Sequence, residues 1–189
     1  MAILNTIVLA DLKYERLLPR TVAVLAGTLL VALGAQAAVP MPGTPVPLTL
    51  GVPAILIVGG LLGPRLGAAS LAAYLVAGSL GLPVFAPGGV PGVARLFGPT
   101  GGYLLAYPLA AAVIGLMARQ RKISLLVTGL VASLMVIHVA GVAQLAILGG
   151  DLAVAAKAGS LPFLVGDAVK LLFAGLVIWR LAPKTNAVL

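Results

Sequence analysis

Apolar residues follow one another in six long stretches along this chain, separated by short segments rich in proline, glycine or basic residues. Runs of about 20 apolar residues are typical of helices that cross a membrane, because a helix satisfies its own backbone groups where lipid offers no partner. Continuous runs, without alternation of apolar and polar positions, argue against a membrane β-barrel. The pattern predicts an all-α membrane protein, a bundle of six transmembrane helices in a single domain, residues 1–189. The expected helices are residues 21–38, 48–62, 66–82, 101–118, 123–148 and 161–181.

Residues 1–20 form a short apolar stretch followed by the charged residues Asp11, Lys13, Glu15 and Arg16. A secretory signal carries its basic residues before the apolar run and not after it. We therefore expect this segment to be retained, as a cytoplasmic or interfacial amphipathic segment ahead of the first span.

The composition limits the classes of function. Apolar residues make up 61% of the chain and charged residues 8%, where a soluble domain carries about 25% charged residues. Six spans take up roughly 120 residues at about 20 each, which leaves no room for a soluble catalytic or ATP-hydrolysing domain. With no cysteine and one histidine, His138, the sequence predicts no thiolate or multi-histidine metal site. No bound cofactor is expected either.

Basic residues fall mostly on one side of the predicted bundle. With six spans, Arg95 and Lys157 lie on one side, Lys170 falls inside the last span, and the other nine of the 12 Lys and Arg residues lie on the side of the termini. Because basic residues gather on the cytoplasmic side, both termini are expected to be cytoplasmic in a multi-pass protein of the cell inner membrane. The net charge of +8 then reports orientation, and no nucleic-acid partner is expected. The nine residues are Lys13, Arg16, Arg20, Arg65, Arg119, Arg121, Lys122, Arg180 and Lys184.

Asp167 and Lys170 are ionisable groups at membrane depth in the last predicted span, within PFLVGDAVKLLF. Three residues apart, they share one face of a helix. Charges within a span are costly and normally face a bundle interior or a wet cavity. An acceptor beside a donor suits a polar, amide-like or ureido-like ligand. The alternative is a structural ion pair that binds nothing.

The segment RLFGPTGGYLLAYP, residues 95–108, places small residues at the start of the fourth predicted span. Thr100, Gly101 and Gly102 would present bare N–H groups, which together with the helix dipole form a seat for an anion. Arg95 and Tyr103 could add further donors. The alternative is an ordinary helix cap with glycines that permit close packing.

Other polar or small residues have weaker functional interpretations. His138 fits best as a packing or interhelical group, and Ser133 lies on a different helix face from it. Tyr74, Phe85 and Tyr107 could form an apolar wall or part of the core.

A small-residue pair, Ala23 and Gly27, lies near the inner end of the first predicted span. Small residues at this spacing allow a second helix to approach closely. The pair is a candidate docking surface for a partner subunit, with packing inside the chain as the alternative.

Four segments resemble the BioY family, the biotin-binding S components of energy-coupling factor (ECF) transporters, in order and spacing. VPMPGTPVPLTL comes first, then GGLLGPRLGAASLAAYLVAGSLGLPVF, then FGPTGGYLLAYPLAA, and finally PFLVGDAVKLL. GLPVF followed by FGPTGGY is a specific pairing, and the GD-x-x-K motif falls in the last predicted span. The resemblance implies a six-helix bundle that binds biotin near its outer face. It also implies a T component and two ATP-hydrolysing subunits as partners.

The resemblance also assigns residues. Asp167 and Lys170 would contact the ureido end of biotin, residues 40–47 would act as a lid, and Ala23 with Gly27 would dock the partner. The start of the fourth span and the loop before it would help to enclose the ligand. The substrate-binding set is Asp167, Lys170, Arg95, Gly101, Gly102, Tyr103, Thr100 and Phe85.

We therefore expect a membrane subunit that captures biotin from outside and is not an enzyme. Three alternatives remain open at this point. They are an intramembrane hydrolase or transferase that uses His138, Ser133 or Asp167, a secondary carrier, and an S component for another vitamin. Whether the chain acts alone, as a homo-oligomer or only with its partners is also open.

Overall fold

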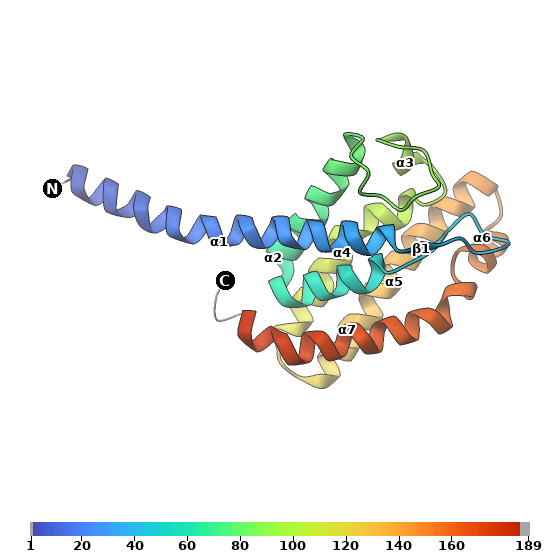
Figure 1. Cartoon of the computed structure of the whole chain (residues 1–189). Helices are drawn as coiled ribbons and strands as arrows, with labels where there is room; N and C mark the ends of the chain where they lie inside the picture. Colours follow the sequence, from blue (N-terminus) through green and yellow to red (C-terminus); the bar gives the residue numbers. More distant parts are fainter. Residues whose placement is uncertain (1, 186–189) are drawn as a thin grey trace.

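The computed structural model describes the backbone of residues 2–185 and the side chains of residues 17–182. The described chain is mostly helical, with one two-stranded antiparallel sheet that pairs Ala38 with Thr49 and Val39 with Leu48 (Figure 1). The elements are α1 (Ala2–Gln36), β1 (Ala38–Val39), β2 (Leu48–Thr49), α2 (Gly51–Ser79), α3 (Ala94–Phe97), α4 (Gly101–Ala118), α5 (Ile123–Gly149), α6 (Leu152–Gly159), a 3-10 turn (Leu161–Phe163) and α7 (Leu164–Thr185).

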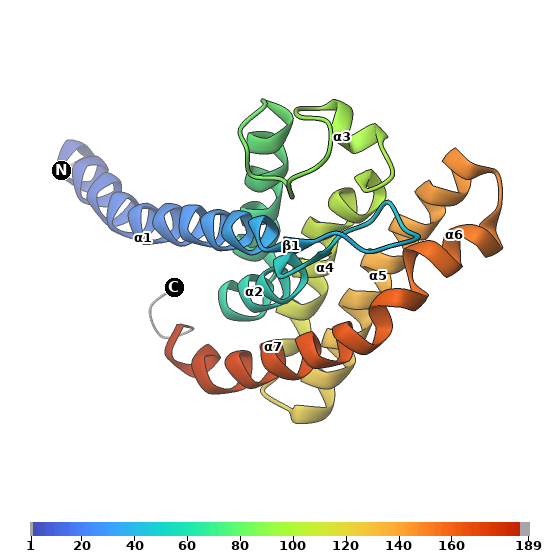
Figure 2. The same ribbon diagram turned by 45° about the vertical axis from the view of Figure 1, so that its right-hand side comes forward.

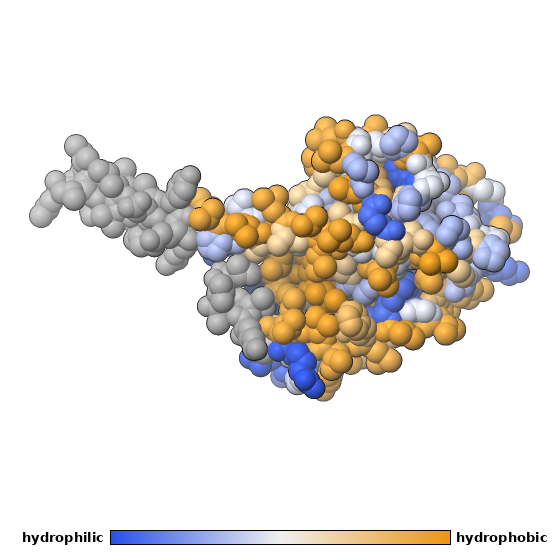
Figure 3. All heavy atoms as spheres, viewed as in Figure 1, coloured by the Kyte–Doolittle hydropathy of each residue, from blue (hydrophilic) through white to orange (hydrophobic). Residues whose placement is uncertain are grey.

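The helices form a bundle in which α4 lies between α2 and α5, while α1 and α7 pack against α2. The first turns of α1 project beyond the other helices (Figure 1). Leucine and valine side chains cover the outer sides of the helices, and the space-filling view shows this apolar flank (Figure 3). Helices that are apolar on all sides are typical of membrane spans, so the prediction of a helical membrane protein is confirmed.

Helix α2 is bent at Gly63, whose φ of 77° lies in the left-handed region, and Pro64 follows it. Glycine adopts this conformation without the steric cost that a Cβ brings. The two arms of α2 run in different directions (Figure 2). They correspond to the second and third predicted spans, residues 48–62 and 66–82.

Five helical segments of the described chain are long and apolar enough to cross a membrane, with α2 counted once. They begin at Leu17, Gly51, Gly101, Ile123 and Leu152. The count of six spans and the cytoplasmic placement of both termini therefore stay predictions.

Three segments differ from their sequence-based description. Residues 1–20 belong in part to α1, which is continuous from Ala2, although the side chains of residues 1–16 lie outside those described. The connections predicted at residues 83–100 and 149–160 contain the short helices α3 and α6. Asp151 begins α6 by accepting hydrogen bonds from the amides of Ala153 and Val154, at 2.7 and 2.9 Å, which is the usual action of an N-cap aspartate.

The helices approach one another closely at glycines. A Cβ on Gly59 would collide with the backbone of Ala111, and one on Gly115 would collide with Gly63. Between helices in lipid, close van der Waals contact of this kind replaces the hydrophobic drive of a water-soluble core. The tight packing of α2 on α4 fixes one wall of the cavity described next.

Candidate binding site

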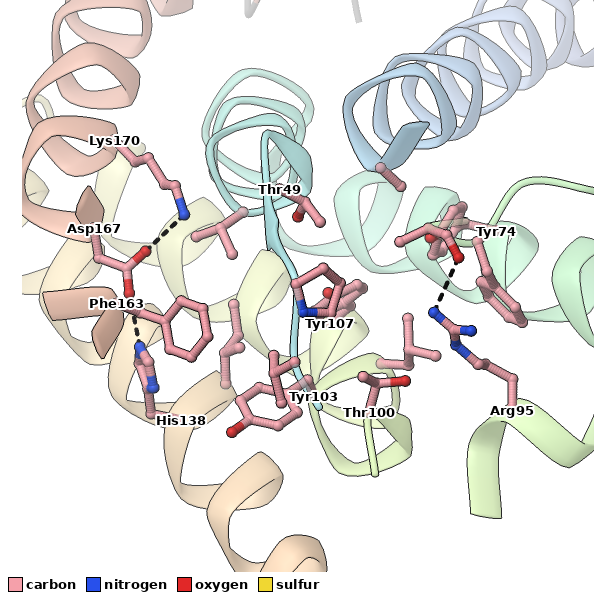
Figure 4. A pocket seen from close by; sticks show the side chains of 18 residues that line it. Thr49, Tyr74, Arg95, Thr100, Tyr103, Tyr107, His138, Phe163, Asp167 and Lys170 are labelled. Carbon is pink, nitrogen blue, oxygen red and sulfur yellow. Dashed lines mark hydrogen bonds and ion pairs between the residues drawn. The ribbon is translucent and has the colours of Figure 1, made fainter. Parts of the chain in front are cut away.

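A pocket with about 670 Å³ of empty space, its open mouth included, lies among α2, α4, α5 and α7. The β1–β2 connection and the loop from Phe85 to Thr100 cover it. Most of its lining is apolar, and its charged side chains lie at two polar places (Figure 4). Its lining residues are Ala35, Val46, Pro47, Thr49, Val52, Tyr74, Phe85, Ala86, Arg95, Thr100, Tyr103, Leu104, Tyr107, Ile137, His138, Phe163, Asp167 and Lys170.

The carboxylate of Asp167 forms the first polar place. It is 2% exposed and lies in the first turn of α7, where the helix dipole favours a negative charge. Lys170 Nζ donates to its Oδ1 at 3.0 Å, and His138 Nε2 from α5 lies 2.9 Å from its Oδ2. A buried charge needs such partners, and both of these partners also line the pocket.

The guanidinium of Arg95 forms the second polar place, across the pocket from Asp167 (Figure 4). Arg95 is 7% exposed and donates to the carbonyl oxygen of Ala86 at 3.0 Å. Its Nε has no hydrogen-bond partner among the residues that the structure describes. Its guanidinium lies directly over Gly89, where a Cβ would collide with it. Among the described residues that line the pocket, Asp167 is the one acidic group, and it is paired elsewhere. Arg95 is therefore suited to bind an anionic ligand group.

Aromatic rings form part of the wall of the pocket. Tyr74 meets Phe85 edge to face, with ring centroids 5.3 Å apart, and lies 6.3 Å from Tyr107. The ring of Phe85 packs on Gly78, which has no side chain to obstruct it. This wall suits an apolar ligand body. Tyr74, Phe85 and Tyr107 line the pocket, and Tyr74 and Phe85 also belong to the buried core, so both interpretations left open by the sequence apply to them.

Two glutamine side chains hold the loop that carries Phe85 and Arg95. Gln36, at the end of α1, donates to the carbonyl oxygens of Pro83 and Phe85 at 2.9 and 3.0 Å. Gln144 of α5 donates to those of Leu96 and Gly98 at 2.9 and 2.6 Å. The covering loop is thus attached near both of its ends.

Six of the eight predicted substrate-binding residues come together in this pocket, and Gly101 and Gly102 do not. A Cβ on Gly101 would collide with the carbonyl group of Leu96, and one on Gly102 with that of Ala140. These two glycines serve close packing, the alternative interpretation of the motif. The six that line the pocket are Asp167, Lys170, Arg95, Thr100, Tyr103 and Phe85; their part in binding stays a prediction.

His138 is the main residue whose place at the site the sequence did not indicate. It is interhelical, as expected, but its partner is Asp167 and it lines the pocket. The two residues are 29 positions apart, and no local pattern joins them. Ser133 donates instead to the carbonyl oxygen of Ala110 at 2.9 Å, so it does not form a dyad with His138.

The two residues of the predicted docking pair, Ala23 and Gly27, differ in burial. Gly27 is buried, and a Cβ on it would lie 2.7 Å from Ser70 Oγ and 3.0 Å from a methyl carbon of Val58. Gly27 therefore serves the packing of α1 on α2 rather than an open surface. Ala23 is half-buried and stays a candidate for partner docking.

Apolar helices around a pocket with two polar places define a membrane-embedded protein that binds a small molecule. No group of three or more His, Cys, Asp or Glu able to hold a metal ion occurs among the described residues. The model of the BioY family matches residues 9–187. The chain belongs to the BioY family.

Named relatives are similar to this chain over most of their length. A probable biotin transporter BioY of Pyrococcus horikoshii is 40% identical over 156 residues, which cover 82% of this chain and 91% of the relative. The biotin transporter BioY of Thermotoga maritima is 37% identical over 155 residues, with coverage of 82% and 90%. The crystal structure of the S-component for biotin from an ECF-type ABC transporter superposes with a TM-score of 0.78 and 27% identity, over 88% of this chain and 92% of that one.

Proposed function

We propose that this chain is the biotin-binding membrane subunit, the S component, of an ECF-type ABC transporter for vitamin uptake. The observation that carries the proposal is the pocket itself, in which Asp167 and Lys170 lie at one polar place and Arg95 at the other. Biotin has a matching division into a ureido ring, an apolar thioether body and a carboxylate. The relatives of this chain are named as biotin transporters, which supports this assignment.

The two polar places give biotin one orientation. The ureido N–H groups donate to the carboxylate of Asp167, and Lys170 donates to the ureido oxygen. The ring body lies against the aromatic wall, and the biotin carboxylate meets the guanidinium of Arg95. The guanidinium of Arg95 has no acidic side chain beside it among the described residues that line the pocket. Such a group favours a carboxylate over a neutral amide.

Transport requires partners that supply energy. The designation of the structural neighbour as the S-component of an ECF-type ABC transporter supports a complex with a T component and two ATPase subunits. The chain would lie in the cell inner membrane with both termini in the cytoplasm. Residues of the β1–β2 connection and of the loop before α4 line one pocket, so α2 returns to the side from which it started. This supports six crossings.

Titration calorimetry of the detergent-purified protein with biotin, desthiobiotin, thiamine and riboflavin tests the proposal. Biotin and desthiobiotin should bind, because both carry the ureido group and the carboxylate, and the two unrelated vitamins should not. Asp167→Asn should weaken biotin binding by about 1.5–3 kcal/mol, the value of a hydrogen bond to a charged group. Biotin binding that is absent in the parent, or unchanged in Asp167→Asn, would reject the proposal or its ureido assignment respectively.

Lys170→Ala separates a binding role from a structural one. Loss of affinity is expected if Lys170 donates to the ligand. Normal affinity in a less stable protein would show that Lys170 only stabilises Asp167, and thermal unfolding of the same preparation measures that stability.

A further inference from the structure

The imidazole of His138 joins α5 to the candidate ligand-binding carboxylate on α7. Nε2 lies 2.9 Å from Oδ2 of Asp167, and the two residues are 7% and 2% exposed. Figure 4 shows Asp167 held between His138 on one side and Lys170 on the other.

The chemistry of the pair fixes the direction of the hydrogen bond. A carboxylate in an ion pair with lysine accepts hydrogen bonds and donates none. His138 must therefore carry a proton on Nε2 and donate it to Asp167. Its other ring nitrogen, Nδ1, is buried and has no hydrogen-bond partner within the described part of the chain. Among the described residues, the hydrogen bonding of this side chain is thus directed at Asp167 alone.

Two donors from two helices hold the plane of the carboxylate. Lys170 holds Oδ1 from the helix of Asp167 itself, through a flexible four-carbon stem. His138 holds Oδ2 from a different helix, through a rigid ring. Without the histidine, the carboxylate of Asp167 would be free to rotate toward Lys170, which lies on the same helix. With His138 in place, the lone pairs of Oδ1 and Oδ2 that can still accept a hydrogen bond point in fixed directions.

We infer that His138 is a positioning residue for biotin recognition: through Nε2–H it fixes the orientation in which Asp167 accepts the ureido N–H groups. The inference rests on the proposed function. It differs from a packing role, in which the shape of the ring matters and the donor does not.

Amide substitutions separate the two roles. In His138→Gln the side-chain amide nitrogen can occupy the place of Nε2 and donate to Asp167, whereas in His138→Asn it corresponds to Nδ1 and falls short. Ser133→Ala is the matched control, because Ser133 is also buried on α5 but donates to Ala110 of α4. Biotin affinity is measured by titration calorimetry for the parent, these three variants, Asp167→Asn, and the double variant His138→Asn with Asp167→Asn.

His138→Gln should bind biotin within about threefold of the parent, and His138→Asn should lose about tenfold or more, as expected for a lost hydrogen bond to a charged group. Ser133→Ala should lower the unfolding temperature without changing affinity. The double variant should bind no worse than Asp167→Asn alone, because His138 acts through the carboxylate that this variant lacks.

Three results would overturn the inference while leaving the proposed function in place. They are parent-like affinity in His138→Asn, equal losses in the glutamine and asparagine variants, and losses that multiply in the double variant. Failure of the parent to bind biotin would reject the proposed function, and the inference with it.

Discussion

The hydroxyl of Tyr103 on α4 donates a 2.6 Å hydrogen bond to the carbonyl oxygen of Gly159, the last residue of α6. The ring of Tyr103 lies over Gly141 of α5, where a Cβ would collide with it. Tyr103 thus joins three helices while one side of its ring lines the pocket. Its hydroxyl is engaged within the protein, so the expected contribution of Tyr103 to binding is the ring and not a donor.

Tyr103→Phe should therefore lower the free energy of unfolding by about 0.5–1.5 kcal/mol, the net value of one hydrogen bond. Biotin affinity should stay within about threefold of the parent. Thermal unfolding and titration calorimetry measure the two effects. Tyr103→Leu is the contrasting variant, because loss of the ring should reduce both stability and affinity. A loss of affinity above tenfold in Tyr103→Phe would instead show that the hydroxyl contacts the ligand.

Arg95 should distinguish charged from uncharged ligands. The parent should bind biotin more tightly than biotinamide, in which a neutral amide replaces the carboxylate. In Arg95→Gln the affinity for biotin should fall by about 1.5–3 kcal/mol, and that for biotinamide should change little. Competition binding with both ligands gives the ratio directly. Equal losses for the two ligands would mean that Arg95 acts by holding the loop at Ala86 rather than by binding the carboxylate.

The attachment of the covering loop predicts a different kind of effect. Gln144→Leu removes the side-chain donor of the carbonyl oxygens of Leu96 and Gly98, of which that of Gly98 still accepts from the Gly101 amide at 3.0 Å. The loop should therefore open more readily, and biotin affinity should fall several-fold. Hydrogen exchange of the amides of residues 83–98 should become faster. Gln36→Leu should act in the same way at the other end of the loop.

Thr128→Val is the control for the loop variants, because Thr128 of α5 donates only to Ser124 of its own helix. Its exchange rates and affinity should match those of the parent. Unchanged loop exchange in Gln144→Leu would show that the glutamine contacts do not hold the loop closed.

The long apolar helices were predictable because the signal for such a helix is local. Predicted residues 101–118 coincide with α4, and residues 123–148 differ from α5 by one residue. The pairing of Asp167 with Lys170 was also accessible, since three-residue spacing on a helix places side chains together. Helix α6 was not predicted because it is short. The sequence does carry a signal for its start, because Gly150 ends α5 in the left-handed conformation and Asp151 caps α6.

The rest of the site depends on tertiary packing. His138 reaches Asp167 only because α5 lies beside α7, and nothing near either residue in the sequence specifies that contact. The same holds for Gly101 and Gly102, since a glycine that presents amides to a ligand and one that admits a neighbouring carbonyl look alike in sequence. Gly27 shows the same ambiguity, because spacing alone does not say which helix its small face meets.

Partner docking through α1 should separate binding from transport. Ala23→Trp should leave biotin affinity in detergent unchanged and abolish biotin uptake by cells that contain the transporter complex, because a large side chain blocks close helix approach. Leu25→Trp is the control, since Leu25 is exposed on the opposite side of α1 and its replacement should preserve uptake. Full uptake by Ala23→Trp would remove this face from consideration.

The number of crossings can be measured because the chain has no cysteine, so each introduced thiol reports one position. Pro42 lies between β1 and β2, Val90 in the covering loop and Gln120 between α4 and α5, and all three are exposed. With six crossings, the two arms of α2 place Pro42→Cys and Val90→Cys on the outer side and Gln120→Cys in the cytoplasm. A membrane-impermeant maleimide should then label the first two in intact cells and the third only after lysis, with the cysteine-free parent as background. If α2 crossed once, Val90→Cys and Gln120→Cys would exchange sides, and the pocket-covering segments around Pro42 and Val90 would have to lie on opposite faces of the membrane.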